Sequence, residues 1–136
     1  MITQPAFKLV TLWILIIIGM ILHFNYHVSE IFYGINVAKP DANGIIPAAA
    51  HVIKNIFYHI PLLIVISLLY FNSKWYKLGL FVLSIIFTLA HAQHLFGEFK
   101  QETYDLSQIP LLVIVLLTSV LINKTSWDYY KNTTQA

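Results

Sequence analysis

The sequence has no cysteine and no arginine among its 136 residues. Without cysteine, the chain can form no disulfide, no Cys-x-x-Cys redox pair and no thiolate metal site. Without arginine, it lacks the planar fork that holds phosphate through two hydrogen bonds. The net charge is also small, at +2. Together these absences predict a protein with no nucleic-acid partner.

Charged residues are scarce, and apolar residues replace them. The sequence is 10% charged and 58% hydrophobic, whereas soluble domains carry about 25% charged residues. A helix needs about 20 apolar residues to cross a bilayer. We expect four transmembrane helices, at about residues 7–28, 47–71, 76–97 and 107–123. The predicted fold is all-α, an integral membrane four-helix bundle in the lipid bilayer, with residues 1–136 forming a single domain.

The lysines are unevenly shared between the two ends of this predicted bundle. The end that holds the N-terminus has five of them: Lys8, Lys74, Lys77, Lys124 and Lys131. The other end has three lysines and most of the acidic residues. The positive-inside rule places the lysine-rich end in the cytoplasm. We therefore expect a multi-pass protein of the inner (plasma) membrane with both termini cytoplasmic.

All six histidines are predicted to lie toward the outer end of the bundle. They are His23 and His27 in the first helix, His51 and His59 in the second, and His91 and His94 in the third. At about 1.5 Å per residue, one histidine in each of these three helices lies about 20–22 Å from the lysine-rich end. Those three are His23, His59 and His91. Imidazoles facing acyl chains would be costly, so the three should point toward one another.

This histidine cluster predicts a metal site. Neutral imidazole is the commonest nitrogen ligand for the transition metals Zn, Cu and Fe. We expect one or two ions of Cu, Fe or Zn, with His23, His59 and His91 as the central ligands. His27 and His94 would complete a second ion or a larger site. His51 lies at the wet end of its helix and fits an interfacial residue as well as a ligand.

Three further side chains are candidates for catalysis. Glu30 and Glu98 could bind the ion, orient an imidazole or carry protons. Glu98 also fits a solvated loop edge. Tyr58 adjoins His59 in the sequence, and a phenol there could donate a proton. Redox or oxygen-related metal chemistry is the expected activity, which would make the protein a membrane-embedded metalloenzyme.

Three alternatives use the same residues. Haem b could lie between two axial imidazoles, such as His59 with His23 or His91, but one haem would leave four histidines unused. Metal-ion or proton transport is a second alternative, although the inner half of each helix contains few polar residues. In the third, the chain is an accessory subunit of a larger membrane complex, or it forms a homo-oligomer.

The stretch HFNYH, which spans His23 to His27, has the HxxxH form of the histidine boxes in membrane di-iron hydroxylases and desaturases. Those families also carry HxxHH boxes, whereas HAQH, from His91 to His94, lacks the second adjacent histidine. The resemblance covers only these few residues, and it assigns no family to the chain.

Overall fold

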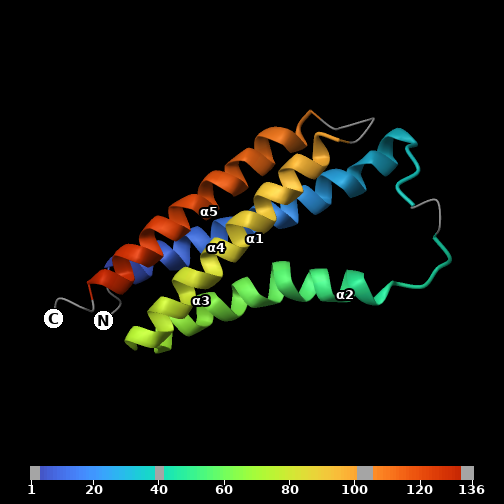
Figure 1. The fold of residues 1–136 in the computed structure, drawn as a ribbon. Helices are drawn as coiled ribbons and strands as arrows, with labels where there is room; N and C mark the ends of the chain where they lie inside the picture. Colours follow the sequence, from blue (N-terminus) through green and yellow to red (C-terminus); the bar gives the residue numbers. More distant parts are fainter. Residues whose placement is uncertain (1–3, 39–41, 101–105, 133–136) are drawn as a thin grey trace.

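The computed structural model describes residues 4–38, 42–100 and 106–132, and within these ranges it is helical with no strand (Figure 1). Four helices are long and apolar enough to cross a membrane: Gln4–Tyr33, Ala48–Tyr70, Lys74–Glu98 and Gln108–Lys131. The predicted all-α architecture with four apolar helices is confirmed. The single-domain assignment stays a prediction.

Two of the four long helices contain changes of helix type. Helix α1 (Gln4–Ser29) continues as a short 3₁₀ helix, η1 (Glu30–Tyr33), which ends at Gly34 in the left-handed conformation with φ 77°. The second long helix has three parts: α2 (Ala48–Lys54), the π-helical turn η2 (Asn55–His59) and α3 (Ile60–Tyr70). The other two are α4 (Lys74–Glu98) and α5 (Gln108–Lys131).

The π-helical turn η2 lies next to Pro61. Proline has no N–H, so the Phe57 carbonyl loses its usual donor, and the sequence predicts a kink there. In the structure the helix widens here into a π-helical turn, and the Ile60 N–H donates to the carbonyl of Asn55, five residues back. Beyond this turn, α2 points away from the other helices (Figure 1). In the described part of the chain, α2 packs against η2 but not against α1, α4 or α5.

The remaining helices pack in the order α4, α5, α1, α3. The core between them is mainly aliphatic, and an edge-to-face contact of Trp13 with Phe87, at 5.2 Å between ring centroids, joins α1 to α4. Gly19 allows α1 to approach α5 closely. A Cβ added at Gly19 would lie 2.5 Å from Val115 Cγ2, so only glycine fits there without movement.

Helix α5 is longer than the transmembrane stretch predicted at about residues 107–123. The sequence placed the end of that stretch where polar residues replace the apolar run. Helix α5 continues to Lys131 because no proline or glycine interrupts it and because Ser126 and Tyr129 are buried against the bundle. The polar residues that follow the apolar run therefore do not end the helix.

The outside of the bundle is largely apolar. Most residues in the apolar stretch of each long helix point outward, and the exposed side chains include many of Leu, Ile, Val and Phe. The buried polar residues lie on the inward faces of α1, α4 and α5. This distribution brings several histidines together at one end of the bundle.

Candidate metal centre

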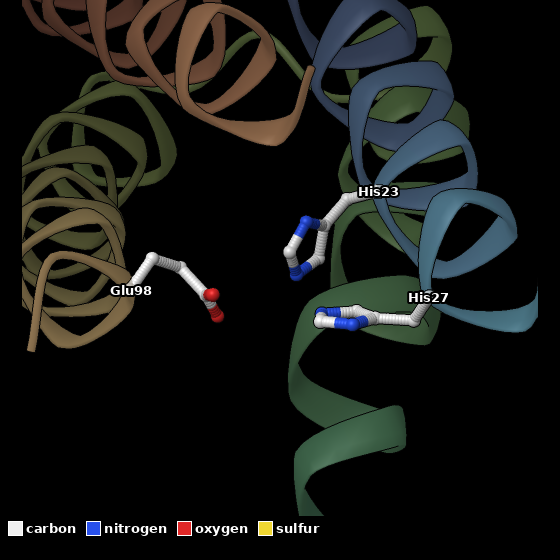
Figure 2. A group of neighbouring side chains, drawn as sticks. All are labelled: His23, His27 and Glu98. Atoms are coloured by element: carbon white, nitrogen blue, oxygen red, sulfur yellow. The ribbon is translucent and has the colours of Figure 1, made fainter. Parts of the chain in front are cut away.

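Helix α1 supplies two imidazoles on one face. His23 and His27 lie one helical turn apart, and their rings make an edge-to-face contact with 4.6 Å between centroids. His23 is only 6% exposed, and His27 is half-buried. Both side chains point toward α4 (Figure 2). The four-residue spacing of these histidines therefore places two imidazole rings side by side on one helix face.

Helix α4 places a carboxylate opposite this pair. Glu98 is 7% exposed, at the last turn of α4, and its carboxylate points toward His23 and His27 (Figure 2). One ligand atom from each of the three residues lies within 4.8 Å of the others. Ligands around a tetrahedral ion lie about 3.4 Å apart when each is about 2.1 Å from the metal. Small side-chain rotations would therefore let all three contact one ion.

His94 lies beside the group, in the turn of α4 that precedes Glu98. Its Nε2 lies 2.9 Å from Nε2 of His23, and the two rings meet edge to face at 4.7 Å between centroids. In this contact one nitrogen must donate its hydrogen while the other accepts it. His94 is therefore held beside His23, within reach as a fourth ligand if the pair separates.

Helix α5 adds a side-chain amide to the same end of the bundle. Gln108 is 2% exposed, and its Nε2 lies 3.4 Å from Nδ1 of His27. Gln108 Oε1 and His23 Nδ1 are both buried and have no hydrogen-bond partner in the described residues. Each buried polar atom left without a partner costs about 1–3 kcal/mol. The cluster therefore has unused bonding capacity that a bound ion or its water ligands would satisfy.

His91 lies one turn deeper in α4, outside the three-residue group. It is 2% exposed, and neither ring nitrogen has a hydrogen-bond partner in the described residues. Its ring packs against Phe57 at 5.6 Å and Phe87 at 6.1 Å between centroids. His91 is as buried as the sequence predicts, but its role as a central ligand stays a prediction.

The histidines of the second long helix are exposed. His59 Nδ1 lies 2.6 Å from Asn55 Oδ1, one turn earlier in the same helix, and His51 is exposed on α2. The structure therefore does not bring His59 into the group that contains His23, although the sequence makes it a central ligand. Its assignment as a ligand is untested and stays a prediction, like that of His51.

The two other predicted catalytic residues also lie outside the group. Tyr58 is half-buried, and its hydroxyl donates to the Met20 carbonyl at 3.5 Å, so it joins η2 to α1. Glu30 is half-buried in η1 and is not one of the three grouped residues. Of the three predicted catalytic residues, Glu98 alone lies in the group.

Sequence reasoning did not anticipate the direct pairing of His23 with His94. Sequence reasoning also gave little weight to the polar residues in the half of the bundle farther from the histidine cluster. Thr88, Ser119 and Asn123 point inward, and Asn123 Nδ2 donates to Thr88 Oγ1 at 3.0 Å, which joins α5 to α4. A hydropathy pattern cannot reveal these contacts, because they depend on how the helices face one another.

The fold and the site together define a class: a helical bundle of four apolar helices with a His/Glu group that could hold a metal ion. No protein-family model matches the chain, and no curated protein or solved structure does so either. The geometry of the site therefore carries the functional argument by itself.

Proposed function

We propose that the protein spans the inner membrane four times and binds a transition-metal ion at the outer end of the bundle. The ion is bound directly by His23, His27 and Glu98. The proposed activity is redox or oxygen-related chemistry. The observation that carries this proposal is the convergence of two imidazoles and a carboxylate within 4.8 Å. This is the one set of three or more such residues with ligand spacing in the described part of the chain.

The membrane location is supported by surface and charge. An outward surface so rich in large apolar side chains is costly in water and favourable in lipid. The lysine-rich end holds the start of α1 and the end of α5, so the positive-inside rule puts both termini in the cytoplasm. The candidate metal centre then opens toward the outer side.

The ligand set favours iron or zinc. Two histidines and one carboxylate form the usual facial set of non-haem Fe(II) oxygenases, and the same set holds catalytic zinc. A Cu(I) site would be expected to use the sulfur ligands that are scarce in this chain. When bound, Fe(II) with open positions supplies reactivity toward oxygen. The protein would hold the ion, orient His27 through Gln108 and limit the access of water.

The haem alternative is less well supported. Two axial imidazoles on one iron place their nitrogens about 4 Å apart, twice the usual metal–nitrogen distance, with a porphyrin between them. The nitrogens of His23 and His94 are only 2.9 Å apart and in direct contact. Haem binding at this pair would require the two helices to separate.

Transport is also less well supported. Polar residues do continue inward below His91, but a narrow void lined by His91, Trp13, Ser84 and Ser119 interrupts them. The void has about 150 Å³ of empty space but no room for a water molecule. This void therefore offers no water-filled path for protons at this level of the described bundle.

The proposal is tested by metal analysis of the purified full-length protein together with an absorption spectrum. We expect about one iron or zinc per chain and no Soret band. The His27→Ala and Glu98→Gln variants should lose the metal, whereas His51→Ala, at an exposed position of α2, should keep it. A parent protein without stoichiometric metal, or equal metal loss in all three variants, would contradict the proposal.

A further inference from the structure

A groove lies at the opposite end of the bundle from the candidate metal centre. It runs between the first turns of α1 and the last turns of α5 and has a volume of about 730 Å³. This size is in the range of small-molecule sites, which is about 300–1,000 Å³. The residues considered below all line it: Lys8 and Leu12 of α1, and Leu121, Lys124, Asp128 and Lys131 of α5.

The charge of the groove favours an anion. Three lysines, Lys8, Lys124 and Lys131, line it together with one carboxylate, that of Asp128. All three lysines are exposed, and the ammonium of Lys131 lies 4.9 Å from the centre of the Trp127 ring. Tryptophan and lysine at the end of an apolar helix are typical of the level of lipid headgroups. The lysines would therefore meet phosphate groups at this depth.

The inner end of the groove is apolar. Leu12 and Leu121 line it one turn closer to the middle of the bundle than Lys8 and Lys124. Leu121 is half exposed, so the apolar wall is open to the outside. A groove with a positively charged end and an apolar wall matches a molecule with an anionic headgroup and a hydrocarbon chain. A free phosphate would leave the apolar wall unused.

We propose that this groove binds an anionic phospholipid of the cytoplasmic leaflet. Its phosphate lies among Lys8, Lys124 and Lys131, and one acyl chain follows Leu12 and Leu121. Basic pockets between helices on the cytoplasmic side of membrane proteins bind such headgroups. Asp128 provides an acceptor for a hydroxyl, which fits a glycerol headgroup. The site rests on the proposed membrane location and is independent of the metal centre.

The test measures lipid binding to the full-length protein in detergent by native mass spectrometry. The probes are dioleoyl phosphatidylglycerol, dioleoyl phosphatidylcholine and soluble glycerol 3-phosphate. The parent protein should bind the anionic lipid at least about tenfold more tightly than the zwitterionic one, since each lysine near a headgroup contributes about fivefold. Glycerol 3-phosphate should bind far more weakly than the lipid.

Matched variants locate the site. Lys124→Gln should lower affinity for phosphatidylglycerol about fivefold, and Lys8→Gln combined with Lys124→Gln about 20-fold, without changing metal content. Lys74→Gln is the control, because Lys74 is exposed at the same end of the bundle but does not line the groove. Its affinity should change less than about twofold.

Three results would overturn the proposal. They are equal binding of the two lipids, an equal loss of affinity in Lys74→Gln and Lys124→Gln, and glycerol 3-phosphate binding as tightly as the lipid. Topology reporters at Ser73 and after Ala136 test the membrane location separately. A cytoplasmic signal from both, with no lipid preference, would reject the lipid site while leaving the membrane location intact.

Discussion

Histidines on the two sides of the bundle end that contains His23 differ in burial. On the side formed by α1, α4 and α5, His23 and His91 are 6% and 2% exposed, and Glu98 is also buried. On the arm formed by α2 and η2, His51 and His59 are exposed. The cause is packing, because α1 and α4 both pack along α5 whereas α2 contacts only η2 in the described chain. A histidine thus gains ligand partners from neighbouring helices, and helical spacing alone does not supply them.

Removing a ligand from the packed side should have the largest effect. We expect His27→Ala to lower metal affinity by more than about 100-fold, beyond the 10–100-fold typical of residues that only orient a ligand. His59→Ala should change it less than about threefold, because His59 is exposed and bonded to Asn55. Metal competition with a chromophoric chelator measures both. Equal losses would mean that the arm closes onto the site and that the contrast between the two sides does not hold in solution.

Acid should release the metal. Metals bind neutral imidazole and ionised carboxylate, so protons compete with the ion for each ligand of the group. Each ligand that must lose a proton weakens binding by about tenfold per pH unit once protonation begins. Affinity, measured by competition with a chromophoric chelator, should therefore decrease as the pH falls and reach a slope steeper than about tenfold per pH unit. An affinity that does not change with pH, or one that follows a single proton, would contradict a site formed by His23, His27 and Glu98.

The close packing of α1 on α5 should be sensitive to a single methyl group. In Gly19→Ala the new Cβ would lie 2.5 Å from Val115 Cγ2. The valine side chain is held to one rotamer in a helix and cannot turn away, so we expect a loss of about 1–2 kcal/mol in the free energy of unfolding. Gly79→Ala is the control, since an added Cβ there meets nothing within 4 Å. It should be neutral or slightly stabilising in the same denaturant titration.

The smallest effect should come from the exposed hydrogen bond on the arm. Asn55→Ala removes the 2.6 Å contact with His59 and should change the free energy of unfolding by less than about 1 kcal/mol. Thr88→Val instead removes the partner of the half-buried Asn123 amide and should cost about 1–3 kcal/mol. Denaturant titration compares the two variants. A larger loss in Asn55→Ala would show that the arm contributes more to stability than its packing indicates.

The sequence was sufficient for the four apolar helices, because length and hydropathy are local properties. It was also sufficient for the pair of His23 and His27, since four-residue spacing in a helix fixes a shared face. It did not predict that α5 would continue past residue 123 or that Glu98 would be buried at the group. Both depend on contacts with other helices. The exposed position of His59 likewise follows from the π-helical turn beside Pro61 and from the direction of α2.

X-ray absorption at the metal edge of the purified, metal-loaded protein tests the central claim most directly. The account predicts at least two imidazole nitrogens at about 2.0–2.1 Å and a carboxylate oxygen at about 2.0–2.2 Å. One imidazole should be lost in His27→Ala and none in His59→Ala. A first coordination shell without imidazole, or one that loses an imidazole in His59→Ala but not in His27→Ala, would contradict a metal centre formed by His23, His27 and Glu98.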